Sequence, residues 1–183
     1  MNTSDYFFWN KVLSKEEIKK INSLLNKYKG EKESVLAKAK ESKKTSTVYP
    51  IEIKFLKEEI SKILYNITKV NQDRYGYDLY NFQDDDKLNY NIYKTGEEYE
   101  WHNDIETFKA SDIKLTALVN ISESSFSGGE FNLLNSKNVT LAAELSNPGS
   151  MIVFNSFILH KVDPIIKGTR KTLTFFAKGP AFK

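Results

Sequence analysis

The stretch KLNYNIYK, residues 87–94, marks the point where the hydrophobic pattern of this chain changes. Its apolar and polar positions alternate, which sets Leu88, Tyr90 and Ile92 on one side and Asn89, Asn91 and Tyr93 on the other. A period of two residues is that of a β-strand with two different faces. We therefore predict that strand structure begins here and continues towards the C-terminus.

The chain before this stretch has helical spacing instead. Ser14 and Glu17 form a capping box, and an apolar stripe follows until Gly30; its residues are Ile18, Ile21, Leu24, Leu25 and Tyr28. A second helix is predicted over residues 55–73, with Leu56, Ile60, Ile63, Leu64, Ile67 and Val70 on one face. The Lys/Ser/Glu-rich residues 31–47 between the helices are expected to form a mobile connection.

Short strands fill the rest of the chain. Their predicted ranges are 113–121, 129–134, 139–145, 150–157, 160–162 and 171–178, and glycines and Asn-Pro-Gly punctuate them. We expect a mainly β (α+β) fold, a jelly roll with the N-terminal helices packed on one sheet. Residues 1–183 would form one domain, with a helical support region (1–80) and a jelly-roll core (85–180).

The amino-acid composition excludes several classes of function. With no cysteine there is no disulfide framework, thiolate metal site or cysteine nucleophile, so any metal must be held by imidazole and carboxylate. No signal peptide and no membrane-spanning stretch is evident, and a net charge of +3 with dispersed lysines argues against a nucleic-acid partner. We expect a cytoplasmic protein, and the Lys-, Asn- and Ile-rich composition suggests a bacterial or phage source.

The chain has only two histidines, and the spacing around them is suggestive. His102 and Asp104 are separated by one residue, so in an extended chain their side chains emerge on the same face. With His160 as a third ligand they would form the two-histidine, one-carboxylate facial triad of non-haem Fe(II) oxygenases. Zinc, cobalt, nickel or manganese would also fit, and the alternative for His160 is a buried histidine at the end of a strand.

Besides the His-x-Asp pair and His160, a third candidate site residue is Arg170. It shares one strand face with Thr172 and Thr174, which is unusual for a strand that only packs in a core. A guanidinium binds a carboxylate bidentately and a hydroxyl adds a hydrogen bond, so these residues suit a small dicarboxylate. The alternative is an arginine at the sheet edge in a surface ion pair.

These motifs together resemble the Fe(II)/2-oxoglutarate-dependent dioxygenases, in particular their prolyl 4-hydroxylase-like branch. The resemblance runs from Asn89 to Lys178 and is carried by YKTGEEYEWHND (93–104), FSGGEFNLL (126–134), PGSMIVFNSFILHKVDPI (148–165) and GTRKTLTFFAKG (168–179). All four follow the order and spacing of the family. The family fold is a double-stranded β-helix, a cupin-like jelly roll with helices on its major sheet, which agrees with the strand pattern.

The resemblance implies a role for each of these residues. His102, Asp104 and His160 would hold Fe(II), and 2-oxoglutarate would chelate the iron with its distal carboxylate on Arg170. Tyr93, Thr172 and Thr174 would assist Arg170, O₂ would be the second cosubstrate, and ascorbate is a candidate reductant. The expected reaction hydroxylates an unactivated C–H bond and releases succinate and CO₂. Relatives that halogenate have a small residue in place of the carboxylate, so Asp104 favours hydroxylation.

The substrate is less constrained. We favour a prolyl or other peptidyl residue, and a small-molecule hydroxylase of the same superfamily is the alternative. Tyr99 and Trp101 flank the His-x-Asp motif and are candidates to line the substrate cleft, unless they are packing aromatics.

Two other classes of protein compete with the dioxygenase assignment. They are a cupin-type metal enzyme that does not use 2-oxoglutarate and a catalytically silent binding module. Arg170 argues against the first and the intact set of four site residues against the second.

Overall fold

The helix predicted after Ser14 begins where its capping box places it. A computed structural model describes residues 6–28, 44–105, 112–134, 139–141 and 143–181. In helix α1 (Lys15–Tyr28) the amide of Ser14 donates to the Glu17 carboxylate at 2.6 Å, and the Glu17 amide donates to Ser14 Oγ at 3.2 Å. This reciprocal pair satisfies two amides that the first turn would otherwise leave without partners.

Helix α2 (Lys57–Val70) confirms the body of the second predicted helix and corrects its ends. A 3₁₀ turn (Ile53–Phe55) precedes it and a π-helical turn (Asn71–Tyr75) follows it, and that turn ends at Gly76, which has a φ of 71°. The predicted apolar face is buried, with Ile60, Ile63, Ile67 and Val70 at most 4% exposed.

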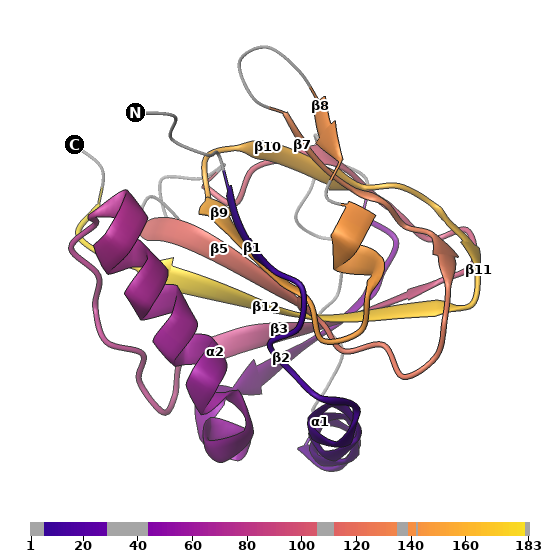
Figure 1. Cartoon of the computed structure of the whole chain (residues 1–183), viewed down its shortest axis with the longest axis horizontal. Coiled ribbons are helices and arrows are strands. Elements are labelled where there is room, and N and C mark those ends of the chain that lie inside the picture. The colour runs from indigo at the N-terminus through magenta and orange to yellow at the C-terminus, as the bar shows by residue number, and fades with distance from the viewer. Residues whose placement is uncertain (1–5, 29–43, 106–111, 135–138, 142, 182–183) are drawn as a thin grey trace.

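Two antiparallel sheets face each other above the helices (Figure 1). In the described part of the chain, the larger sheet has the order β1-β9-β5-β12-β3-β2, formed by Tyr6–Trp9, Met151–Asn155, Ile113–Asn120, Thr169–Lys178, Lys87–Lys94 and Thr47–Glu52. The smaller sheet has the order β4-β10-β7-β8, formed by Tyr99–His102, Leu159–Val162, Phe131–Leu134 and Val139–Leu141. β6 (Ser127–Gly128) pairs with β11 (Ile165–Lys167). This is the predicted jelly roll.

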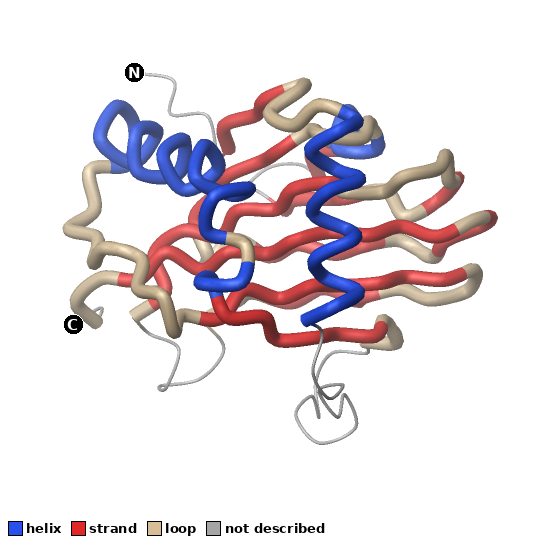
Figure 2. The backbone as a smooth tube through the Cα atoms, turned by 90° about the horizontal axis from the view of Figure 1, so that it is seen from below, coloured by secondary structure: helices blue, strands red, loops and turns tan. Residues whose placement is uncertain are grey.

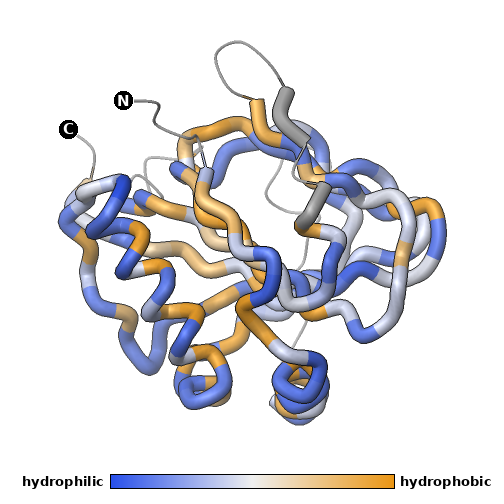
Figure 3. Tube along the Cα trace, in the orientation of Figure 1, coloured by the Kyte–Doolittle hydropathy of each residue, from blue (hydrophilic) through white to orange (hydrophobic). Residues whose placement is uncertain are grey.

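The helices lie together on the outer face of the larger sheet (Figure 2). Their apolar faces and the outward residues of β3, β5, β9 and β12 form one buried cluster, which includes Leu88, Leu173 and Phe175. A second cluster lies between the two sheets and includes Tyr93 and Phe131. In Figure 3 hydrophobic and hydrophilic residues alternate along α2, as expected for a helix with one buried face. The inner face of the larger sheet is thus left to line the space between the sheets.

β3 confirms the alternation seen in KLNYNIYK, but the N-terminal region is less purely helical than expected. β1 and β2 both lie within residues 1–80, and they form the two edges of the larger sheet. Pro50 within β2 lacks an amide hydrogen, which is tolerated on an edge strand and hides such a strand from sequence patterns. Of the connection expected over 31–47, residues 31–43 lie outside the described ranges, and Thr47 already belongs to β2.

Other strand predictions hold with adjusted bounds. The strand predicted over 139–145 is wrong in its second half, because β8 ends at Leu141 and a 3₁₀ turn occupies Ala143–Ser146. The short strands β4, β6 and β11 were not predicted, since four residues or fewer carry little periodicity. Within the described ranges, no helix has the length and apolar character needed to cross a bilayer.

Candidate metal and cosubstrate site

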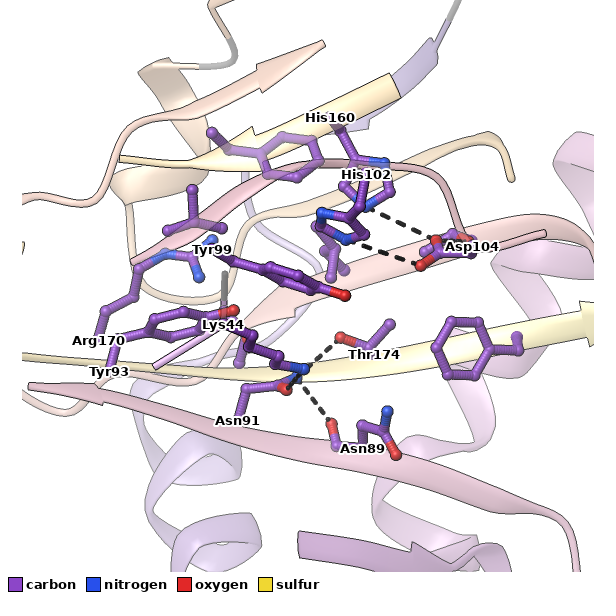
Figure 4. Close-up of a pocket in the computed structure, with 16 residues that line it drawn as sticks. Lys44, Asn89, Asn91, Tyr93, Tyr99, His102, Asp104, His160, Arg170 and Thr174 are labelled. Atoms are coloured by element: carbon purple, nitrogen blue, oxygen red, sulfur yellow. Dashed lines mark hydrogen bonds and ion pairs between the residues drawn. The ribbon is translucent and has the colours of Figure 1, made fainter. Parts of the chain in front are cut away.

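His102, Asp104 and His160 come together at one end of the smaller sheet. β10 pairs with β4 so that His160 lies directly opposite His102, and Asp104 follows two residues after the end of β4. Nε2 of His102 lies 3.9 Å from Asp104 Oδ1, and Nε2 of His160 lies 3.7 Å from Asp104 Oδ2. One ligand atom from each residue lies within 4.8 Å of the other two, so a single ion could bind all three. Figure 4 shows the three side chains converging.

The backbone fixes which nitrogen each imidazole presents. Nδ1 of His102 lies 2.8 Å from the carbonyl oxygen of Glu100, and Nδ1 of His160 lies 2.9 Å from that of Ile158. A carbonyl oxygen only accepts, so both Nδ1 atoms carry the proton and donate. In the neutral form of each imidazole, Nε2 then keeps a free lone pair on the Asp104 side, as a metal ligand requires.

Burial keeps His102 uncharged. Its side chain is almost fully buried, and this burial, together with the neighbouring His160, lowers the pKa of His102 to about 2. The imidazole is then neutral at any physiological pH, so no proton has to leave it when a cation binds.

The carboxylate of Asp104 is oriented by contacts from another strand. The Thr116 hydroxyl of β5 donates to Asp104 Oδ2 at 2.5 Å, and the Asp104 amide donates to the Ser156 carbonyl at 2.9 Å. Second-layer contacts of this kind set the direction of a ligand's lone pairs. The sequence did not identify Thr116, because its contact with Asp104 depends on how β5 packs beside the end of β4.

Arg170 lies at the other end of the same pocket (Figure 4). Its side chain is 2% exposed, and its Nη2 atom is buried without a hydrogen-bond partner among the described residues. The guanidinium carbon lies 5.4 Å from the centre of the Tyr93 ring. Burial lowers the pKa of Arg170, but a guanidinium stays protonated in proteins, so the site holds a buried cation. An anionic ligand would supply the missing partner.

The predicted faces of β12 are confirmed. Thr172 and Thr174 line the pocket with Arg170, whereas Leu173 lies in the cluster under the helices. Asn91 donates to Thr174 Oγ1 at 2.9 Å, so this hydroxyl can direct its own hydrogen into the pocket. Sequence reasoning missed several lining residues, which are Lys44, Asn89, Asn91, Leu118, Phe131, Val162 and Phe176. The polar face of KLNYNIYK was the available signal for the two asparagines.

Tyr99 and Trp101 end on opposite sides of β4. Tyr99 lines the pocket and stacks on His102 with ring centres 3.4 Å apart. The register of β4 on β10 shifts between the pairs His160–His102 and Val162–Tyr99, and this bulge turns Tyr99 and His102 to the same face although they are three residues apart. Trp101 lines a neighbouring groove, to which Tyr99 also contributes, and the Lys161 ammonium lies 5.3 Å from the centre of its ring. The structure therefore does not bring Trp101 into the metal pocket.

A jelly roll with an open His/Asp/His cluster and a buried arginine in one pocket defines a class, the mononuclear metal oxygenases that use an anionic cosubstrate. The family model described as the 2OG-Fe(II) oxygenase superfamily matches residues 88–178, which include all four of these side chains. The chain belongs to this superfamily, and it is a 2-oxoglutarate-dependent dioxygenase that uses Fe(II) and O₂. Among curated protein sequences, none matches the chain.

Three of the solved structures with a similar fold are prolyl hydroxylases. The Pseudomonas putida prolyl-4-hydroxylase has a TM-score of 0.74 at 16% identity, covering 96% of this chain and 93% of that one. The viral collagen prolyl hydroxylase from Paramecium bursaria Chlorella virus-1, in a 2-oxoglutarate complex, has a TM-score of 0.69 at 19% identity, with 96% and 97% covered. A Trichoplax adhaerens prolyl hydroxylase in complex with a peptide fragment of the hypoxia inducible factor oxygen degradation domain has a TM-score of 0.69 at 18% identity, with 97% and 84% covered. The chain has the fold of the prolyl 4-hydroxylase-like branch.

The residues present fit the cofactor and cosubstrate of the superfamily. The metal cluster offers two imidazoles and one carboxylate, a donor set that suits Fe(II). The unpartnered Nη2 of Arg170 is a donor for a carboxylate at the far end of the pocket.

Proposed function

We propose that this dioxygenase hydroxylates an unactivated C–H bond of a prolyl or other peptidyl residue, with release of succinate and CO₂. His102, Asp104 and His160 would hold Fe(II), and Arg170 would bind the distal carboxylate of 2-oxoglutarate. The iron with its cosubstrate supplies the oxidising chemistry when bound, while the chain provides geometry, charge and a site from which water is excluded.

The observation that carries the cosubstrate assignment is the buried guanidinium of Arg170. A cation that is 2% exposed and has an unpartnered donor is costly to maintain unless a ligand pairs with it. A cupin-type enzyme that does not use 2-oxoglutarate has no need of such a group. We assign Tyr93, Thr172 and Thr174 to the same end of the pocket, as neighbours that orient the ligand beside Arg170.

A peptidyl substrate is favoured by the fold. The Trichoplax adhaerens neighbour is a complex with a peptide fragment, and the other neighbours quoted above are also named as prolyl hydroxylases. Tyr99 lines the pocket and stacks on His102, and we assign it to substrate contact. A small-molecule substrate, ascorbate as reductant, a cytoplasmic location, a bacterial or phage source and the absence of nucleic-acid and membrane partners stay predictions.

The first test is an anaerobic titration of the metal-free protein with Fe(II) and then with 2-oxoglutarate. A weak visible charge-transfer band that needs both components would establish chelation of the cosubstrate. His102→Ala and His160→Ala should remove metal binding. Arg170→Ala should keep iron but weaken 2-oxoglutarate by about 2–5 kcal/mol, as for other buried charge-assisted pairs that lose one partner. Iron binding without the band would favour the cupin-type alternative.

The second test addresses the substrate. Proline-containing peptides and free amino acids would be incubated with the iron-loaded enzyme and 2-oxoglutarate. A mass increase of one oxygen atom in a peptide, in step with succinate release, would support the peptidyl assignment. Oxygen transfer to a free amino acid alone would identify a small-molecule hydroxylase instead.

A further inference from the structure

Ser46 is a second buried polar group without a partner near the candidate cosubstrate site. Its side chain is 1% exposed, and its Oγ atom, like Nη2 of Arg170, has no hydrogen-bond partner among the described residues. Buried hydroxyls are nearly always hydrogen-bonded, because leaving one unpaired costs free energy. Two such atoms in one region point to a ligand that would satisfy both.

Strand register places Ser46 and Arg170 on either side of Tyr93. Arg170 of β12 pairs directly with Tyr93 of β3. Thr47 of β2 pairs with Ile92, so Ser46, one residue earlier, lies beside Tyr93 on the other flank. Cross-strand neighbours point to the same face of a sheet, which here is the face that lines the pocket.

The environment of Tyr93 agrees with this placement. Burial raises the pKa of the Tyr93 phenol, and the Arg170 guanidinium opposes that rise. The Ser46 hydroxyl opposes it too as a polar neighbour of the phenol, although the two groups do not meet the geometry of a formed hydrogen bond. Both groups are therefore close enough to favour negative charge at the same point. A carboxylate placed there would accept hydrogen bonds from either side.

Ser46 is held in position by neighbours on two strands. The Thr45 amide donates to the Glu98 carbonyl at 3.1 Å, and the Glu98 amide donates to Thr45 Oγ1 at 2.8 Å. Lys44 forms a β-bridge with Tyr99 just before this contact, and β2 begins just after it at Thr47. Residues 44–47 thus connect the smaller sheet to the larger one. Because these contacts already hold Ser46 in place, little further ordering is needed when a ligand binds.

We propose that the Ser46 hydroxyl donates a hydrogen bond to the distal carboxylate of 2-oxoglutarate and shares this group with Arg170. The inference rests on the cosubstrate role proposed above for Arg170. It extends the carboxylate site to a residue from the N-terminal region, outside residues 88–178 that match the superfamily. Ser46 is a binding and positioning residue in this assignment and takes no part in the oxidation itself.

The test compares two ligands on the Mn(II)-loaded protein, in which no turnover occurs. Both 2-oxoglutarate and 2-oxopentanoate have five carbons and the same chelating end, but only 2-oxoglutarate has a distal carboxylate. Calorimetry should show that Ser46→Ala weakens 2-oxoglutarate by about tenfold, the size expected for one hydrogen bond to a charged group. It should leave 2-oxopentanoate and Mn(II) affinity unchanged, and Ser46→Thr should restore most of the loss.

A second variant separates direct contact from an effect through Tyr93. If Ser46 contacts the ligand, its loss should still weaken 2-oxoglutarate in a Tyr93→Phe background. An effect that disappears in that background, or that is equal for the two ligands, would show that Ser46 only supports Tyr93 and would overturn the inference. Unchanged binding by Ser46→Ala would overturn it as well.

The wild-type titration keeps this inference separate from the proposed function. If the wild-type protein binds 2-oxoglutarate no better than 2-oxopentanoate, the carboxylate role of Arg170 fails and the role of Ser46 fails with it. If the wild-type protein prefers 2-oxoglutarate and Ser46→Ala keeps the full preference, only the Ser46 assignment is lost.

Discussion

The hydroxyl of Thr116 donates a 2.5 Å hydrogen bond to Oδ2 of Asp104, although β5 and the end of β4 are separate strands of different sheets. The same carboxylate oxygen lies 3.7 Å from Nε2 of His160. Thr116 thereby joins the larger sheet to the candidate metal ligands, and the orientation of the carboxylate depends on it.

Removing this hydroxyl should weaken metal binding. Thr116→Val keeps the shape of the side chain and should lower Fe(II) affinity by about 10–100-fold, the usual cost of losing a contact behind a metal ligand. Anaerobic competition titration with a chelator measures the change, and Thr116→Ser is the matched control that keeps the hydroxyl. Equal affinities for the Val and Ser variants would contradict the role assigned to Thr116.

Tyr99 and Trp101 should respond differently to truncation. Tyr99→Leu removes the ring that stacks on His102 and should lower Fe(II) affinity by about 3–10-fold, since aromatic pairs contribute about 0.5–1.5 kcal/mol. Trp101→Leu changes only the outer groove and should leave metal and 2-oxoglutarate binding within about twofold of wild type. A larger loss of Fe(II) affinity in Trp101→Leu than in Tyr99→Leu would contradict the assignment of Tyr99, and not Trp101, to the metal pocket.

A side chain at Gly129 should destabilise the protein by steric overlap in addition to backbone strain. Its φ is 68°, and an added Cβ would overlap Cδ1 of Ile165 and lie 3.2 Å from Cδ of Arg170. Gly129→Ala should lower the free energy of unfolding by about 2–4 kcal/mol, combining left-handed strain with overpacking.

Gly96 provides the control for this prediction. Its φ is 83°, but no described atom lies within 4 Å of an added Cβ, so Gly96→Ala should cost only the strain of about 1 kcal/mol. Urea denaturation of both variants gives the two values. Gly129→Ala should also weaken 2-oxoglutarate through the displaced Arg170, whereas Gly96→Ala should not.

Acid should destabilise the metal-free protein through His102. Its folded-state pKa of about 2 lies far below the value of about 6.5 expected for an unfolded chain. The stability that depends on neutral His102 is complete above about pH 6.5 and falls as the pH drops towards the folded pKa, because only the unfolded chain takes up the proton.

The expected slope is about 1 kcal/mol per pH unit between roughly pH 6 and pH 4.5. Urea unfolding of the metal-free protein across this range measures it, and His102→Gln should show a shallower slope. If both proteins lose stability in parallel, then His102 is not held neutral by the fold.

The amino-acid sequence determined the elements whose signals are local. The capping box at Ser14 and Glu17 starts α1, and the two-residue period of KLNYNIYK defines the faces of β3, because capping and side-chain alternation involve only neighbouring residues. The order and spacing of the four motifs around His102, His160 and Arg170 were enough to indicate the superfamily.

Only the tertiary structure decided the contacts that depend on strand register. Ser46 lies beside Tyr93 because β2 pairs with β3, Thr116 reaches Asp104 because β5 packs beside the end of β4, and Tyr99 turns towards His102 because β4 has a bulge. Each contact joins segments whose alignment is set by the packing of the whole sheet, and a shift of one residue would turn these side chains to the opposite face.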